Sequence, residues 1–345
     1  MIKKKVLLRV DGNSQIGLGH IYRCIAIAEM LKEDFECEFL LSSQSISNKI
    51  IPKEFSIKII PPNYSFEFED KWIAENYNKH SVLIILDGYQ FNSDYQKKIK
   101  ASGIKSIYID DLAKEYIYAN AVINHSPSAK EKDYQKENDT KLFLGTDYAM
   151  LRQGFLQKAK LPYSTYQPIH SVLISMGGSD ENNITLKIVE ALLPIKQIQK
   201  INIVLGAAYQ YKNTLQQLLV TSKKNSQLFS NLPEKEIIEL MQLSDAAIAP
   251  CSTTCLELFA INKPVFAGFS ASNQINLYTY FSENNLIVDL KNLQTITIKE
   301  IQDIVESNIE HRNEINKMLI LQRQLINGYS TTKIKEIVSN LFHES

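Results

Sequence analysis

The sequence predicts an α/β protein of two similar domains, each with strands and helices in alternation. The chain has 345 residues, enough for about two domains of ordinary size. Short apolar runs of strand length alternate with segments of helical periodicity, as in parallel sheets with crossover helices. Hydrophobic residues make up 44% of the chain and charged residues 22%, both ordinary values for a globular protein.

The first half of the chain forms a series of strand–helix–strand units with short connections. The run at Val82–Leu86 lacks alternation, which is typical of a strand buried on both faces of a parallel sheet. The same reasoning predicts strands at Val6–Val10, Glu38–Leu41, Val82–Leu86 and Ser106–Ile109, and helices at Ile21–Leu31 and Tyr95–Ala101.

A polar break separates the two halves. Lys130–Lys141 is almost entirely charged or polar and predicts a surface loop or an exposed helix. Pro162 and Pro168 bracket a segment with neither periodicity, which predicts a linker. We therefore expect a first domain over residues 1–165 and a second over residues 166–345.

The alternation restarts in the second half. It predicts strands at Val172–Met176, Ile201–Leu205, Ala246–Ala249 and Pro264–Ala267, and helices at Ile184–Leu193, Leu215–Lys223 and Leu256–Ile261. The segment from about Ile298 is helical and long enough to cross back onto the first domain. Two such domains on one linker form a cleft, where ligands bind beyond the carboxyl ends of the strands.

Composition excludes several classes of protein. Lys and Arg number 38 and Asp and Glu also 38, so a protein that coats nucleic acid is not expected. No apolar run approaches the ~18 residues of a membrane span, and the apolar stretch after the basic N-terminus is too short for a signal peptide. No second Cys or His pair with metal-ligand spacing accompanies Cys251 and Cys255, so we expect no metal site. Four cysteines do not make a disulfide scaffold, and we expect a cytoplasmic location.

The first predicted strand runs into a glycine-containing turn and then a helix. The glycines at 12, 17 and 19 match neither the dinucleotide-binding fingerprint nor the Walker A loop. His20 stands at the helix entrance, where the positive end of the helix dipole favours a neutral imidazole. A neutral imidazole can act as a general base. The alternative is a histidine that only caps or packs the turn.

The second half contains three more junctions with polar or glycine residues. Gly177 and Gly178 allow a phosphate to approach a helix N-terminus, or form a plain turn with Ser179 or Asp180 as helix cap. At the next junction, the hydroxyls and amides of Ser252, Thr253 and Thr254 suit a pyrophosphate, and Glu257 could accept hydrogen bonds from a ribose diol. At the last junction, Asn273 and Gln274 offer amide donors and acceptors. The alternative for Thr254 and Glu257 is a capping box.

Acidic residues follow two strands of the first half. Asp87-Gly88-Tyr89 and Asp110-Asp111 both stand at the carboxyl edge of the predicted sheet. Neighbouring residues of a strand point to opposite faces, so only one of Asp110 and Asp111 can easily face a cleft, and we expect turn or cap roles rather than a metal pair. The remaining histidines lack a partner pattern and are expected to be structural or exposed: His80, His125, His170, His311 and His343.

Together these residues resemble a known family. Asp11, Gln15–His20 and Arg23 look like the N-terminal signature of the UDP-2,4-diacetamido-2,4,6-trideoxy-β-L-altropyranose hydrolases of pseudaminic acid synthesis. The further matches, in order along the chain, are Asp87–Tyr89, Asp110-Asp111, Gly145-x-x-Tyr148-x-x-Leu151-Arg152-x-x-Phe155, Met176–Asp180, Ser252–Glu257 and Asn273-Gln274. The second-half motifs are also similar to those of the wider glycosyltransferase group that includes the lipid II N-acetylglucosaminyltransferase. The resemblance ends near residue 290.

The resemblance implies a GT-B-type fold, with two Rossmann-like domains facing a cleft and UDP held mainly by the second. It implies that water attacks the anomeric carbon and UDP leaves, without metal or cofactor. His20 falls on the catalytic base of the family and Glu257 on a nucleotide-binding acid. The expected substrate-binding residues are Asp11, Gln15, Gly17, Gly19, Tyr89, Arg152, Asn273 and Gln274, and the expected UDP-binding residues are Gly177, Gly178, Ser252, Thr253, Thr254 and Glu257.

The expected partner is the UDP-sugar, with no nucleic acid and no membrane, and we expect a monomer. One alternative is a UDP-sugar glycosyltransferase of the same fold, which would add an acceptor site. Another is a sensor that binds a nucleotide-sugar without turnover. A related deoxy-diacetamido sugar or another nucleotide also remains open, because no motif for base selection or sugar stereochemistry can be read.

Overall fold

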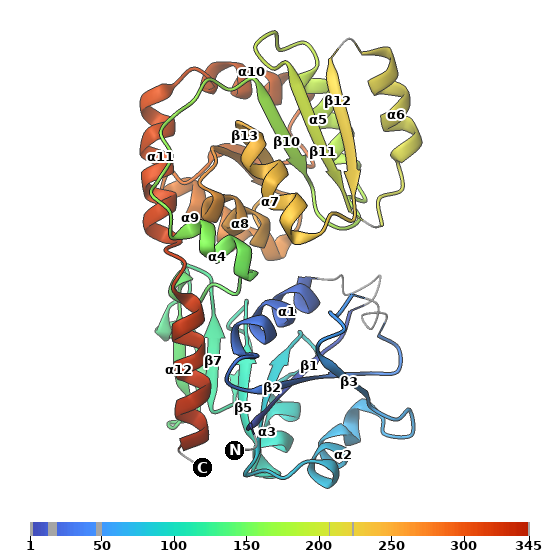
Figure 1. Cartoon of the computed structure of the whole chain (residues 1–345), viewed down its shortest axis with the longest axis vertical. Helices are drawn as coiled ribbons and strands as arrows, with labels where there is room; N and C mark the ends of the chain where they lie inside the picture. The colour runs from blue at the N-terminus through green and yellow to red at the C-terminus, as the bar shows by residue number, and fades with distance from the viewer. Residues whose placement is uncertain (1–2, 13–18, 46–49, 207, 223, 344–345) are drawn as a thin grey trace. The chain divides into compact units, whose positions relative to one another are not determined.

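The computed structural model describes residues 3–12, 19–45, 50–206, 208–222 and 224–343, and these form two compact units (Figure 1). The first unit comprises Met1–Gln153 and Tyr329–Ser345, and the second comprises Gly154–Gly328. Each unit is built on one main parallel sheet with helices between its strands. The predicted α/β class is therefore confirmed.

The first unit contains a seven-stranded parallel sheet of order β3-β2-β1-β4-β5-β7-β9. The strands are β1 (Lys5–Val10), β2 (Glu36–Leu41), β3 (Ser56–Ile59), β4 (Val82–Asp87), β5 (Lys105–Ile109), β7 (Ala121–Asn124) and β9 (Lys141–Leu144). The strand order reverses between β1 and β4, which makes their carboxyl ends the topological switch point where ligands bind in such sheets. Val10 is paired with Asp87, so both strands end there at one level.

Helices cover the sheet of the first unit. They are α1 (Gly19–Leu31), α2 (Glu69–Asn76), α3 (Ser93–Ala101) and α12 (Ser330–His343), with short 3-10 turns η2 (Phe66–Phe68), η3 (Glu131–Asp133) and η4 (Thr146–Tyr148). The minor strands β6 (Tyr116–Ile117) and β8 (Gln135–Lys136) form a separate pair. The segment expected to be loop or exposed helix thus contains η3 and β8.

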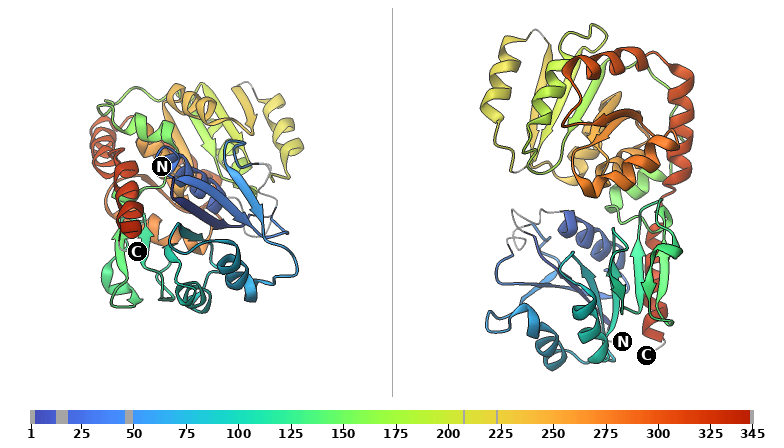
Figure 2. Two further views of the ribbon diagram at one scale, coloured as in Figure 1. Left: turned by 60° about the horizontal axis from the view of Figure 1, so that its bottom comes forward. Right: turned by 180° about the vertical axis from the view of Figure 1, so that it is seen from behind.

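The last helix, α12, belongs to the first unit although it follows the second along the chain. Figure 2 shows it in red beside the strands of this unit in both views. The rings of Phe35 and Phe342 stack with centroids 5.6 Å apart, and Lys4 Nζ donates to the Phe342 carbonyl oxygen at 3.1 Å. Burial of its apolar face therefore holds the helix in place.

The boundary between the units lies at Gln153 rather than near residue 165. Helix α4 (Gln153–Ala159) packs with the second unit, where the Gly154 amide donates to Glu234 Oε1 at 2.6 Å. Arg323 Nη1 also donates to the Ala159 carbonyl oxygen at 2.6 Å. The segment between the two prolines is thus part of the second unit and not the linker. Prolines indicate a loop but do not indicate which unit the loop contacts, so the predicted boundary was misplaced.

The second unit contains a six-stranded parallel sheet of order β12-β11-β10-β13-β14-β15. The strands are β10 (Ser171–Ser175), β11 (Lys200–Leu205), β12 (Asn225–Ser230), β13 (Ala246–Pro250), β14 (Val265–Phe269) and β15 (Val288–Asn292). Its switch point lies between β10 and β13. The carboxyl ends of β10, β13 and β14 therefore meet at one edge of the sheet.

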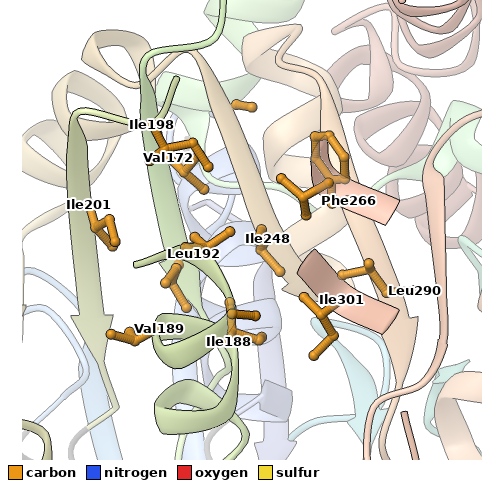
Figure 3. Close-up of a cluster of buried hydrophobic side chains, with 14 of the residues drawn as sticks. Val172, Ile188, Val189, Leu192, Ile198, Ile201, Ile248, Phe266, Leu290 and Ile301 are labelled. Carbon is orange, nitrogen blue, oxygen red and sulfur yellow. The ribbon is translucent and has the colours of Figure 1, made fainter. Parts of the chain in front are cut away.

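The helices of the second unit besides α4 are α5 (Ile184–Leu192), α6 (Lys212–Thr221), α7 (Glu234–Leu243), α8 (Thr253–Ile261), α9 (Ile275–Glu283), α10 (Ile298–Asn308) and α11 (Arg312–Leu325), with the 3-10 turn η5 (Ser272–Gln274). In the core, sheet residues Val172, Ile248 and Phe266 pack against Ile188 of α5 and Ile301 of α10 (Figure 3). Among the described residues, none of the helices is long and apolar enough to cross a membrane.

Candidate active site

The switch point of the first unit brings His20 against Asp87. Asp87 is the last residue of β4 and is completely buried, and His20 is the second residue of α1. The Nδ1 atom of His20 lies 2.7 Å from Oδ1 of Asp87. The two residues are far apart in the sequence, and the parallel pairing of β1 with β4 brings them together.

The ionisation of Asp87 determines which ring nitrogen of His20 carries hydrogen. Burial alone would raise the pKa of Asp87, but Arg23 and His20 hold that pKa well below its usual range. The carboxylate can only accept hydrogen bonds, so Nδ1 of His20 is the donor. In the neutral ring the lone pair is then on Nε2, which is the arrangement of a histidine held for proton abstraction.

Arg23 links this pair to a second carboxylate. It lies one turn after His20 on α1, and its Nε donates to Oδ2 of Asp87 at 2.8 Å while Nη2 lies 2.5 Å from Oδ1. Its Nη1 donates to Oδ1 of Asp111 at 2.7 Å. Burial opposes the charge of Arg23, but Asp111 and Asp87 raise its pKa well above the ordinary value. The guanidinium therefore stays charged and bridges both carboxylates.

The two neighbouring aspartates after β5 have different roles, as the alternation of strand side chains predicts. Asp110 accepts hydrogen bonds from the Leu112 and Ala113 amides and from the Tyr134 hydroxyl, so it stabilises a turn. Asp111 instead accepts from Arg23, so the expected turn or cap role is right for Asp110 and wrong for Asp111. Burial would raise the pKa of Asp111, but Arg23 lowers it.

His125 lies close to the same charged groups, although no pattern in the sequence groups it with them. It directly follows β7, is almost fully buried, and accepts a hydrogen bond from the Met150 amide through Nδ1 at 3.4 Å. Burial and the charge of Arg23 lower the pKa of His125 to about 4, against the opposing effect of Asp111 and Asp87. The only available signal was its place after Ala121–Asn124, whose three apolar residues and one asparagine were too few to be recognised as a strand.

The other predicted residues of the first unit lie around this cluster. Tyr89 is half exposed, and its ring meets that of His20 edge-on with centroids 5.0 Å apart. Asp11 is buried, and its carboxylate accepts from Arg9 Nη1 at 2.7 Å and from the Ser42 amide at 2.8 Å. Asp11 therefore stabilises the chain at the end of β1 through Arg9 and the Ser42 amide, and a contact with substrate would be an additional role.

Four more predicted residues of the first half of the chain make no described contact with the His20–Asp87 pair. Gly19 is exposed at the first position of α1, and Arg152 is partly exposed just before α4. Gln15 and Gly17 lie outside the described residues.

The glycine turn after β10 has an open backbone. Gly177 and Gly178 are both exposed, Gly177 has φ +88°, and a Cβ at either position would meet nothing within 4 Å. A Cβ on Gly206 would come within 2.1 Å of the Gly178 carbonyl oxygen, so glycine is required there. The Asp180 carboxylate accepts from the Ile184 and Thr185 amides at 2.8 Å each, so it satisfies the first amides of α5. The N-cap residue itself is Asn183, not Ser179 or Asp180 as the alternative expected.

The turn after β13 does not contain the capping box. Helix α8 begins at Thr253, and its N-cap is Ser252, whose Oγ accepts from the Thr254 amide at 3.3 Å. Glu257 lies one turn into α8 and is partly exposed. The capping-box interpretation is therefore wrong, because β13 extends to Pro250 and the helix starts too early for Thr254 to cap it.

The turn after β14 places two amide side chains before α9. Asn273 is exposed within η5, and Gln274 accepts from the Ser270 amide through Oε1 at 2.8 Å. Together with the turns after β10 and β13, this turn gathers the predicted residues of the second unit at one edge of its sheet. Among the described residues there is no group of three or more His, Cys, Asp or Glu side chains that could hold a metal ion.

Relatives with similar sequences have been described in bacteria and archaea. The chain is 26% identical over 294 residues to the UDP-2,4-diacetamido-2,4,6-trideoxy-β-L-altropyranose hydrolase of Campylobacter jejuni, covering 83% of this chain and 99% of that protein. It is 23% identical to the spore coat polysaccharide biosynthesis protein SpsG of Bacillus subtilis, covering 81% of each. An uncharacterised protein of Methanocaldococcus jannaschii is 28% identical over 79% of this chain, which spans 57% of that protein. No family model matches the chain.

Solved structures show the same fold at lower sequence identity. MurG of Acinetobacter baumannii superposes with a TM-score of 0.69 at 13% identity, covering 98% of this chain and 99% of that one. The calicheamicin glycosyltransferase CalG4 gives a TM-score of 0.65 at 10% identity, with 99% of both chains covered. The chain therefore has the GT-B-type α/β fold of these glycosyltransferases, and the resemblance of its sequence to a UDP-diacetamido-trideoxy-altropyranose hydrolase is confirmed.

Proposed function

We propose that this chain is an enzyme that acts on a UDP-sugar. More specifically, we propose that it hydrolyses UDP-2,4-diacetamido-2,4,6-trideoxy-β-L-altropyranose at the anomeric C1–O bond. The products are UDP and 2,4-diacetamido-2,4,6-trideoxy-L-altrose. The observation that carries the proposal is the His20–Asp87 pair at the switch point of the first unit, in a chain similar to such a hydrolase.

His20 acts as the general base in this reaction. Nε2 takes a proton from the water molecule that attacks C1, and the oxygen of that water forms the new bond to C1. Asp87 holds the ring through Nδ1 and stabilises the imidazolium as it forms. A positioned base contributes about 10²–10⁴ to the rate, and the orientation of the reactants contributes further.

The second unit binds the UDP that leaves. Cleavage of the C1–O bond places negative charge on the β-phosphate, which needs hydrogen-bond donors. The Asp180 carboxylate already takes the first amides of α5, so the donors after β10 are the backbone amides of Gly177 and Gly178. The amides and hydroxyls at the start of α8 supply the others, from Ser252 and Thr253. Glu257 accepts hydrogen bonds from the ribose.

A UDP-sugar glycosyltransferase is the second candidate, and the solved structures of this fold favour it. MurG and CalG4 both superpose over nearly the whole chain, and CalG4 is a glycosyltransferase by name. In a transferase, the same base would remove a proton from an acceptor hydroxyl instead of water. Release of UDP in the absence of any acceptor separates the two candidates.

The test is to incubate the full chain with the UDP-sugar and EDTA, and to measure UDP and free sugar. We expect UDP and sugar in equal amounts from the wild type, and a loss of at least ~10²-fold in the His20→Asn variant. His80→Asn is the matched control, because His80 is exposed and lies away from the site. Turnover of His20→Asn close to that of the wild type, or release of UDP only with an added acceptor, would contradict the proposal.

A further inference from the structure

We propose that Arg23 and Asp111 together set the pH range in which His20 acts as a base. Neither residue reaches the substrate in this scheme: both are positioning residues that act through the electrostatic environment of the imidazole. The inference rests on the proposed function for its consequence in catalysis. The effect of the two charges on the titration of His20 does not depend on the proposed function, because it can be measured without substrate.

The contacts of Arg23 place a fixed positive charge beside the imidazole. Its Nη2 atom lies 3.1 Å from Nδ1 of His20, and the same Nη2 lies 2.5 Å from Oδ1 of Asp87. Arg23 and His20 therefore both donate to one carboxylate oxygen. When His20 accepts a proton, two positive charges share that oxygen, and a like charge at this distance disfavours the protonated ring.

Asp111 balances this charge from the opposite side of the guanidinium. With a neutral His20, one cation and two carboxylates leave the cluster with a net charge of about −1. Neutralising Asp111 brings the cluster to zero, which disfavours the imidazolium. Neutralising Arg23 brings it to about −2, which favours the imidazolium. The two changes therefore shift the titration of His20 in opposite directions.

The other groups around His20 do not replace these charges. Asp87 is the hydrogen-bond partner and stays ionised, and the Cys24 thiol lies 3.7 Å from the same carboxylate with a raised pKa, because burial disfavours the thiolate. His125 follows β7 and has a pKa lowered to about 4 by burial, so it adds no charge at neutral pH. Tyr89 contacts the ring edge-on. Among the described residues, Arg23 and Asp111 are thus the charges that can be changed without removing the partner of His20.

The experiment follows the imidazole of His20 by NMR in the full chain, with the signal assigned by its absence from His20→Asn. In Asp111→Asn the titration midpoint is expected to fall by about one pH unit, and in Arg23→Gln to rise by about as much. Arg23→Lys keeps the charge and should stay near the wild type. Asp111 is partly exposed, so Asp111→Asn keeps the test possible if Arg23→Gln fails to fold.

The same variants are assayed for UDP release against pH. On the acid side of the profile of kcat/KM against pH, called the acid limb here, the midpoint should move in the same direction as the titration of His20. If Arg23 and Asp111 only stabilise the fold, the variants lose stability while titration and acid limb stay in place, and the inference is overturned. If the midpoints move as expected but no UDP-sugar is hydrolysed, the charge interaction stands and the proposed function fails.

Discussion

His125 should make the first unit less stable as the pH falls below neutrality. Its folded pKa is lowered to about 4 because it is buried beside Arg23, whereas a histidine in the unfolded chain titrates near ~6.5. Between these values the unfolded state binds the extra proton, so the free energy of unfolding falls as the pH falls. From about pH 7.5 to about pH 5 the loss is ~2 kcal/mol, and it approaches ~3 kcal/mol below about pH 4.

The assay is urea unfolding at these two pH values, followed by tryptophan fluorescence. Trp72 is the only tryptophan of the chain and is buried in the core of the first unit, so it reports on the unit that contains His125. Other groups titrate in the same window, and comparison with the His125→Asn variant, which cannot titrate there, removes their contribution. His80→Asn, at an exposed position, is the control.

If the wild type and His125→Asn lose the same free energy of unfolding between about pH 7.5 and about pH 5, His125 is not held neutral by burial and by Arg23. The His80→Asn control should keep the full pH dependence of the wild type. If His80→Asn and His125→Asn both lost the pH dependence of the free energy of unfolding, its assignment to His125 would also be refuted.

Three further predictions concern buried charges and backbone. Glu69→Gln removes the carboxylate that pairs with Nε and Nη2 of the buried Arg9 at 2.9 Å each. The free energy of unfolding measured in urea should fall by ~3–5 kcal/mol, and a fall of less than ~1 kcal/mol would contradict this. Asp87→Asn should lower kcat by about 10³-fold or more, because the ring of His20 loses its acceptor; steady-state kinetics would contradict this if kcat stayed within a factor of about 10. Gly206→Ala should weaken UDP binding at least about tenfold in calorimetry, because the new Cβ displaces the Gly178 carbonyl; unchanged affinity in a folded variant would count against the role of that turn.

The fold was predictable where strands are apolar throughout. Val82–Leu86 is buried along its whole length, so its composition alone identified it as a central strand. The edge strand β12 was missed, because Asn225–Ser230 is half exposed and has the polar composition of a loop. The boundary between units was misplaced because α4 is too short to be recognised by periodicity, and its assignment depends on what it packs against.

The site was predictable at single residues and not in its pairs. The position of His20 at a helix start identified it as a candidate base, but its bond to Asp87 depends on the order of the strands in the sheet. The same is true of Arg23, whose partner Asp111 follows the next strand, β5. Long-range contacts of this kind follow from topology, and no local pattern in one sequence encodes them.

Attack of water on C1 is measured in water labelled with oxygen-18, with the UDP-diacetamido-trideoxy-altropyranose as the only substrate. Attack of water on C1 predicts that the wild type releases UDP without the heavy isotope, and that His20→Asn releases ~10²-fold less UDP in the same time. Mass spectrometry of the released UDP measures both quantities at once. Label in the β-phosphate of UDP would place the attack on phosphorus instead of C1, and equal release by the wild type and the variant would exclude His20 as the base.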